Sequence, residues 1–226
     1  RQGGPWPAGG FMPPVARQRH CASQLTHYRT LVRGGPTSWN VRDQHMTETL
    51  ARLLDFHGPG AKAIVWEHNT HIGDARATDM LRAGMVNVGQ LARERWGEDD
   101  VVLVGFATHR GTVIAGEEWG APMEVMSVPP ARPGSWEDVL HRAGAGDKLL
   151  LLDAVDDAAF AEPRGHRAIG VVYRPGLESY GNYVPSVLPF RYDALLYLDE
   201  SRALHPLHLH ARAPDGELPE TYPTGM

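Results

Sequence analysis

A segment of nine residues brings together side chains that could act as bases, acids or ligands. Residues 66–74, Trp-Glu-His-Asn-Thr-His-Ile-Gly-Asp, contain two imidazoles, a carboxamide and two carboxylates. The apolar run 63–66 is predicted to be a buried strand, and open α/β sheets bind ligands just beyond the ends of such strands. His71 follows His68 by three positions, so a loop can bring both imidazoles to one point. Such a pair can hold a metal, transfer protons or hydrogen-bond an ester carbonyl.

The same two histidines also have a purely structural interpretation, in which they cap backbone groups of a loop. H-x-x-H is a weak motif on its own, and the helical zinc motif H-E-x-x-H does not occur in the chain. Both interpretations therefore stay open at the level of sequence.

Arg42 is the second candidate. It precedes Met46 by four positions and Leu50 by eight, which predicts that it lies at the inward-facing end of the apolar stripe of a helix. A buried guanidinium needs a carboxylate or a polar cavity, because burying it unpaired is costly. Arg42 is therefore either a site residue or a brace paired with a carboxylate, while Asp43 favours the helix N-terminus through the helix dipole.

Other nucleophiles and ligand sets have less support. No serine lies in a G-x-S-x-G elbow, so the sequence does not indicate a serine hydrolase. The single Cys21 excludes an internal disulfide framework and a multi-cysteine zinc site, and it fits a reducing compartment. His208 and His210 would share a face on a strand and could bridge a metal, although a solvated tail is the simpler interpretation.

Composition and charge exclude several classes of protein. The chain has 226 residues and a formal net charge of −5, with no long run of Lys or Arg, so no nucleic-acid partner is expected. The longest apolar stretch, 101–107, is far shorter than the roughly 20 residues that span a bilayer. The N-terminus shows no signal-peptide pattern. We therefore predict a cytoplasmic protein without a membrane partner; these features do not encode its oligomeric state.

The hydrophobic pattern predicts one α/β domain at 16–210, between a Gly/Pro-rich leader or linker at 1–15 and a polar tail at 211–226. Helices are expected at 16–33, at 77–83, at 88–96 after Asn87, at 136–142 after Ser135, and from Ser38 or Asn40 to the Gly58-Pro59 stop, with Met46, Leu50, Leu53 and Leu54 on its apolar face. Strands are expected at 63–66, 149–152, 168–173, 194–198, and 101–107 with a hairpin return at 112–115. These elements predict a mixed, largely buried β-sheet with helices on both faces.

Several of these segments resemble the erythromycin esterase family in order and spacing. The resemblance covers about residues 24–205 and includes the stretches Ser-Trp-Asn-Val-Arg-Asp at 38–43, Ile-Val-Trp-Glu-His-Asn-Thr-His-Ile-Gly at 64–73, Asn-Val-Gly-Gln-Leu at 87–91, Val-Leu-Val-Gly-Phe at 102–106 and Ala-Ile-Gly-Val-Val-Tyr at 168–173. It implies an erythromycin-esterase-like α/β fold and hydrolysis of an ester by an activated water, with a histidine as general base and no covalent serine intermediate.

Carried over by position, the resemblance implies that His68 and His71 match the family's second histidine pair and that Arg42 matches its active-site arginine. Side chains around these residues would contact the substrate, and we expect this of Trp66, Glu67, Asn69 and Asp74. Glu67 departs from the small residue that the family often has before the first histidine, which bears on local packing or substrate shape.

The resemblance also implies that part of the site lies elsewhere. The family's proposed general base belongs to an N-terminal G-E-x-x-H segment that this sequence lacks, and family members are about twice as long. The chain opens with Arg1 rather than Met and is expected to be the C-terminal half of the domain, supplying part of the site.

The expected partner is a small-molecule ester, for which a macrolide lactone is one candidate, and no cofactor is expected. Two alternatives remain. In the first, the chain is a small-molecule-binding remnant without catalysis. In the second, it is a metal-dependent hydrolase in which His68 and His71 bind the ion together with Asp74 or Glu67.

Overall fold

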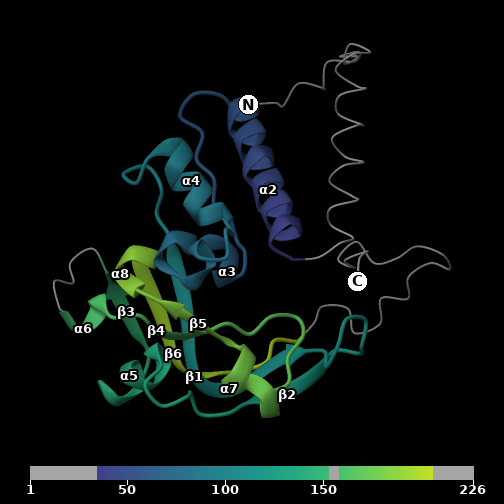
Figure 1. Cartoon of the computed structure of the whole chain (residues 1–226), viewed down its shortest axis with the longest axis vertical. Helices are drawn as coiled ribbons and strands as arrows, with labels where there is room; N and C mark the ends of the chain where they lie inside the picture. The colour runs from purple at the N-terminus through teal and green to yellow at the C-terminus, as the bar shows by residue number, and fades with distance from the viewer. Residues whose placement is uncertain (1–34, 153–157, 206–226) are drawn as a thin grey trace.

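The structure is a computed structural model that describes residues 35–152 and 158–205, coloured in Figure 1. Its helices are α2 (Gly35–His57), α3 (Asn69–Ile72), α4 (Val88–Trp96), α5 (Trp136–Arg142), α6 (Ala158–Ala161), α7 (Glu178–Gly181) and α8 (Leu188–Arg191). Its strands are β1 (Val104–Ala115), β2 (Glu124–Val128), β3 (Lys148–Leu151), β4 (Arg164–Arg167), β5 (Tyr183–Ser186) and β6 (Ala194–Ser201). None of the described helices is both long enough and apolar enough to cross a bilayer.

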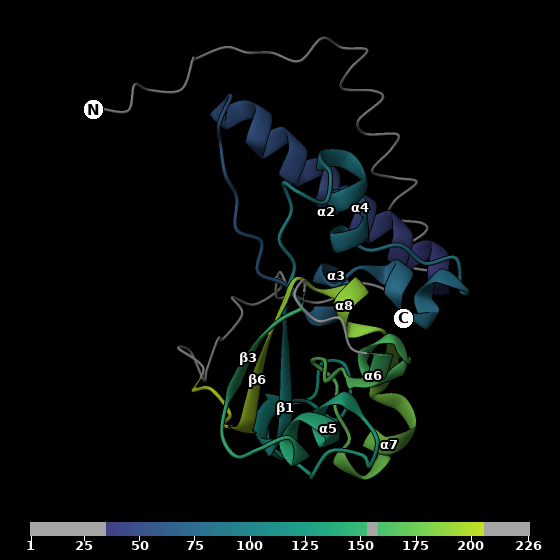
Figure 2. The same cartoon turned by 90° about the vertical axis from the view of Figure 1, so that its left-hand side faces the viewer.

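The central sheet is mixed, as predicted. Its strand order is β2-β1-β6-β3, with β1 parallel to β6 and antiparallel to β2, and with β3 antiparallel to β6. Strands β4 and β5 form a separate antiparallel pair. Figure 2 shows α5, α6, α7 and α8 on one side of the central sheet, while α2 and α4 lie beyond one end of the strands. The α/β architecture is therefore confirmed.

The two faces of the central sheet differ. On one face, buried side chains of β1 and β6 form a core with α5 and α8 that includes Ala107, Trp136, Leu140, Leu188, Tyr192, Leu195 and Tyr197. On the other face, apolar side chains are exposed or only partly buried, among them Val104, Phe106, Leu149, Leu151 and Leu198. Within the described residues this face borders a cleft of about 1490 Å³, so the expected cover on both faces is not found there.

Local capping signals located two helices correctly. Helix α4 begins after Asn87, whose side chain accepts a hydrogen bond from the Gln90 amide, and α5 begins after Ser135, whose hydroxyl accepts one from the Asp138 amide. Each of these side chains satisfies an amide that the first helical turn cannot pair. The helix predicted at 77–83 is replaced by 3₁₀ turns at Ala75–Ala77 and Asp79–Leu81.

Helix α2 ends as predicted but begins earlier and buries a different face. Gly58 follows it with a φ of 86°, in the left-handed region that glycine adopts at helix ends. Ser38 and Asn40 lie inside the helix rather than capping it. The buried positions are Asp43, Thr47 and Ala51, whereas Leu53 is exposed and Met46, Leu50 and Leu54 are only partly buried. Arg42 is exposed, so its predicted inward orientation is wrong.

The predicted strand 63–66 is not a strand. Ile64 is 95% exposed and Trp66 is 82% exposed, and both line the cleft. A strand here would need a free edge of the sheet. The first part of β1 has such an edge, because β2 pairs only with the end of β1. The Asn69 side chain occupies the backbone groups of that edge: its amide nitrogen donates to the Phe106 carbonyl and its oxygen accepts from the Phe106 amide.

Two other strand predictions need correction. Residues 104–107 and 112–115 belong to the single strand β1, which begins at Val104 rather than at 101, and the antiparallel return is β2. Gly111, with a φ of 134°, permits this continuation, because a Cβ there would lie 2.0 Å from the Ser201 carbonyl oxygen. The predicted strand 168–173 is not found: this segment makes a single bridge, between Val172 and Gly116 just after β1, and the strand that precedes it, β4, ends at Arg167.

The strands predicted at 149–152 and 194–198 are found as β3 and β6, each with slightly different ends. The leader at 1–15, the helix at 16–33 and the tail with His208 and His210 lie outside the described residues. Those boundaries stay predictions.

Candidate active site

Asp43 and His71 form a carboxylate–imidazole pair between α2 and α3. The Asp43 side chain is fully buried, and both of its oxygens lie 2.9 Å from Nδ1 of His71. An ionised carboxylate can only accept hydrogen bonds, so Nδ1 carries a proton, and in the neutral ring Nε2 then has the lone pair. The His71 side chain is 17% exposed, and no described residue hydrogen-bonds its Nε2. The geometry therefore presents an accepting nitrogen toward solvent.

Trp39 fixes the plane of this imidazole. The two rings stack with centroids 4.3 Å apart and an angle of 4° between them. The Trp39 indole in turn donates to the Val86 carbonyl at 2.8 Å, and the Arg42 guanidinium lies 5.0 Å from the centre of the same indole. One turn of α2 thus supplies a carboxylate, an aromatic platform and a positive charge to His71.

His68 is held differently, although it belongs to the same H-x-x-H motif. Its Nε2 lies 2.8 Å from the Ile169 carbonyl oxygen and must donate to it, because a carbonyl only accepts. Its Nδ1 accepts from the Thr70 amide at 3.3 Å and lies 2.9 Å from the Thr70 hydroxyl, which makes His68 the N-cap of α3. Burial lowers the pKa of His68, so the neutral ring is favoured. Both of its nitrogens are therefore engaged in positioning the chain.

Glu67 connects this cluster to the cleft. The side chain is half-buried, and its Oε2 has no hydrogen-bond partner among the described residues. Burial raises the pKa of Glu67, and the negative charge of Asp43 adds to this, while His71 and Arg42 oppose it. Trp66, Glu67, His68 and Asn69 line the cleft, whereas His71 lies beside it.

Asn69 and Asp74, which we expected to contact substrate, are occupied by structural contacts. The Asn69 amide is bonded to Phe106, as described above. Asp74 is buried, caps the turn Ala75–Ala77 and pairs with Arg76 at 2.7 Å and Arg93 at 3.3 Å. These contacts lower the pKa of Asp74 although burial opposes the shift. Asp74 does not line the cleft, whereas Trp66 does and lies 5.6 Å from the Phe106 ring.

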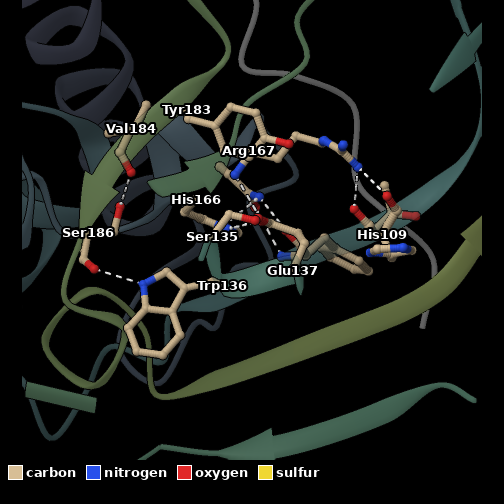
Figure 3. A network of polar contacts seen from close by, with 12 residues as sticks. His109, Ser135, Trp136, Glu137, His166, Arg167, Tyr183, Val184 and Ser186 are labelled. Carbon is tan, nitrogen blue, oxygen red and sulfur yellow. Dashed lines mark hydrogen bonds and ion pairs between the residues drawn. The ribbon is translucent and has the colours of Figure 1, made fainter. Parts of the chain in front are cut away.

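Two further carboxylate–imidazole pairs lie outside the motif and were not predicted. Glu137 and His166 are paired in the protein interior at 2.6 Å, as Figure 3 shows. His141 pairs with Asp199 at 2.7 Å and stacks on His109 with a centroid distance of 3.8 Å. The partners in each pair are 29 and 58 positions apart, so no local spacing could have revealed them. Asp43 was noted only for its place near the helix start, and its pairing with His71 also depends on tertiary structure.

A metal centre has no support in the described part of the chain. No group of three or more His, Cys, Asp or Glu side chains there is arranged to hold an ion. The nitrogens of His68 and Nδ1 of His71 are directed at other protein atoms, so these two residues do not converge as ligands.

Comparisons with known proteins identify a family from the sequence and a shared fold from solved structures. A sequence model of the erythromycin esterase family matches residues 15–201. Among solved structures, the chain is similar to a succinoglycan biosynthesis protein (TM-score 0.62, 17% identity, 85% of this chain and 52% of that chain covered). A Bacillus cereus protein gives a TM-score of 0.61 at 19% identity, with 83% and 45% covered. An erythromycin esterase mutant in its open conformation gives 0.55 at 20% identity, with 82% and 44% covered. The chain thus spans about half the length of these proteins.

Proposed function

This chain belongs to the erythromycin esterase family, and from that premise we propose that it contributes part of an active site that hydrolyses a carboxylic ester with an activated water. The observation that carries the proposal is the Asp43–His71 pair, whose Nε2 is the accepting nitrogen of the cluster. A buried carboxylate that fixes the tautomer and orientation of an imidazole is the arrangement by which many enzymes prepare a general base.

In the proposed reaction, a water oxygen attacks the ester carbonyl carbon while Nε2 of His71 takes one water proton. The carbon–oxygen bond to the alcohol then breaks, and the proton passes from His71 to the departing oxygen. The Arg42 guanidinium is suited to stabilise the negative charge that develops on the carbonyl oxygen. Burial raises the pKa of Glu67, which shifts this carboxyl toward its hydrogen-bond-donating form. His68 has a positioning role, because it caps the turn that carries His71.

The lining of the cleft favours an ester with a large apolar body. Exposed or partly buried apolar side chains of three segments, including Leu54, Ile64, Trp66 and Phe106, surround a volume of about 1490 Å³. Apolar clefts of this kind bind ligands through surface burial, and a few polar groups fix their orientation. A macrolide lactone belongs to this substrate class.

The test uses the intact protein with an aryl ester and a macrolide lactone, and mass spectrometry to detect addition of one water. We expect turnover that falls in His71→Asn and persists in His141→Asn. His141 is a matched control, because it also pairs with a carboxylate through Nδ1 and also stacks on an aromatic ring. Equal activity of His71→Asn and wild type would refute the proposed role of His71.

Binding without turnover by the wild-type protein would favour the second candidate, a non-catalytic binding domain, for which the apolar cleft is the supporting feature. Turnover that a chelator abolishes and added zinc restores would favour a metal-dependent hydrolase instead.

A further inference from the structure

The buried pair Glu137–His166 lies directly behind the segment that carries the candidate site. The side chains of Glu137 and His166 are 0% and 1% exposed. Glu137 Oε1 lies 2.6 Å from His166 Nδ1 and also accepts from the Arg167 amide at 2.8 Å (Figure 3). Nε2 of His166 lies 3.4 Å from the amide nitrogen of Asn69.

The carboxylate determines where the His166 proton sits. Oε1 of Glu137 accepts from the Arg167 amide and faces Nδ1 of His166, and these contacts lower the pKa of Glu137 against the opposing effect of burial, which favours the ionised form. An ionised carboxylate accepts and cannot donate, so Nδ1 of His166 carries a proton.

The orientation of the Asn69 amide is equally well determined. Its nitrogen donates to the Phe106 carbonyl at 2.5 Å, and its oxygen accepts from the Phe106 amide at 3.0 Å. Turning the amide over would place donor against donor and acceptor against acceptor on the strand edge. The group that faces His166 is therefore the NH₂ end of Asn69, and Nε2 of His166 must present a lone pair to it.

From these contacts we infer that Glu137 and His166 are positioning residues that hold Asn69, and through it the turn bearing His68 and His71, against the edge of β1. The inference rests on the proposed function, because it assigns the pair to the support of that site. Glu137 keeps a proton of His166 on Nδ1, and the neutral ring with that tautomer accepts from the Asn69 side-chain amide through Nε2. The other tautomer, or the doubly protonated ring, would set an N–H against the NH₂ of Asn69.

The position of Asn69 affects the positions of both motif histidines, because Asn69 begins α3 and follows His68 directly. Its carbonyl oxygen accepts from the Arg191 guanidinium at 3.2 Å and lies 3.5 Å from the Tyr192 hydroxyl. The side chain and the carbonyl thus fix this residue to β1, to α8 and to His166. A shift of about 1 Å in such a support can cost on the order of 10²-fold in rate, because catalytic geometry tolerates little displacement.

The test compares His166→Leu with His166→Gln in the intact protein. A leucine cannot accept from Asn69, whereas the glutamine oxygen reaches the position of Nε2 and can. We expect His166→Leu to shift the NMR signals of the Asn69 side-chain amide and of the His71 ring, and to slow ester hydrolysis about 10- to 100-fold. His166→Gln should restore most of both. The matched control is His109→Gln, because His109 is also buried but lies on β1 and stacks on His141 of α5 rather than on the motif.

The wild-type protein gives a second, independent measurement. Imidazole ¹⁵N spectra at neutral pH should show His166 with its proton on Nδ1 and an unprotonated Nε2. A proton on Nε2 in the wild type, or unchanged Asn69 and His71 signals in His166→Leu, would overturn the inference. A wild-type protein that shows the expected tautomer but does not hydrolyse esters would refute the proposed function and leave the positioning of Asn69 by His166 supported.

Discussion

Asp43–His71 and Glu137–His166 are the same chemical pair in two different settings. In both, a fully buried carboxylate accepts from Nδ1 of a histidine and leaves Nε2 as the accepting nitrogen. They differ in what Nε2 meets. Nε2 of His166 faces the Asn69 side-chain amide inside the protein. The His71 side chain, on α3 beside α2, is 17% exposed. A buried pair can therefore position neighbouring groups, while the open pair is the one suited to proton transfer.

The loss of Glu137 should have the largest effect. Glu137→Leu removes the partner of a buried histidine and of the Arg167 amide, and breaking such a pair costs about 3–5 kcal/mol. Asp43→Leu should cost less, because His71 can turn to water. Urea unfolding measures both. An equal loss of unfolding free energy in the two variants would show that the greater exposure of His71 does not make its pair less important for stability than the Glu137–His166 pair.

The two histidines of the motif should respond differently to the same substitution. His71→Asn removes the proposed base and should slow ester hydrolysis about 10²-fold or more. His68→Asn should slow it far less, because asparagine is itself a good N-cap and can keep the turn in place. Steady-state kinetics on one aryl ester provides the comparison. A larger loss in His68→Asn would reverse the assignment of roles.

The orienting carboxylate should have an intermediate effect on catalysis. Asp43→Asn preserves shape but can present its NH₂ to Nδ1, which disfavours the Nδ1–H tautomer of His71. We expect about a 10- to 100-fold lower kcat/KM, the usual cost of losing a group that orients a functional histidine. Wild-type kcat/KM in a folded Asp43→Asn protein would mean that the pair has no catalytic role.

Acid should destabilise the protein in two stages, and this is the smallest effect. The pKa of His68 is lowered from 6.5 by burial, so below about pH 6.5 the unfolded chain binds more protons and stability falls. The pKa of His109 is lowered by burial too and adds to this stage. The pKa of Glu137 is lowered from 4.5, so its contribution is lost only below that value. Urea-unfolding midpoints measured across pH check this. In the double variant His68→Asn/His109→Gln, the fall in stability below about pH 6.5 should disappear, while the fall at lower pH should remain.

Local signals determined the elements that the sequence predicted well. The boundaries of α4 and α5 follow from Asn87 and Ser135, whose side chains cap the helices within three residues. The motif segment was also found from sequence, because its polar residues are contiguous. The strands β3 and β6 followed from the apolar runs in 149–152 and 194–198.

Long-range contacts determined what the sequence could not reveal. The apolar run 63–66 fits a strand, but Asn69 takes the sheet edge that such a strand would need. The buried face of α2 carries Asp43 because His71 lies against it, and an amphipathic pattern alone places the leucines there instead. Glu137 and His166 are 29 positions apart and meet only after β4 packs on α5.

The most direct test of the account is the tautomeric state of His68 and His71, measured by ¹⁵N NMR of the intact protein at mildly alkaline pH. We expect the two rings to be opposite tautomers. His71 should carry its proton on Nδ1, facing Asp43, and His68 should carry its proton on Nε2, facing the Ile169 carbonyl. That result would leave His71 as the motif histidine with an accepting Nε2. A His71 ring with its proton on Nε2 would contradict the role of His71 as general base, because no lone pair would then remain on Nε2 to take a proton from water.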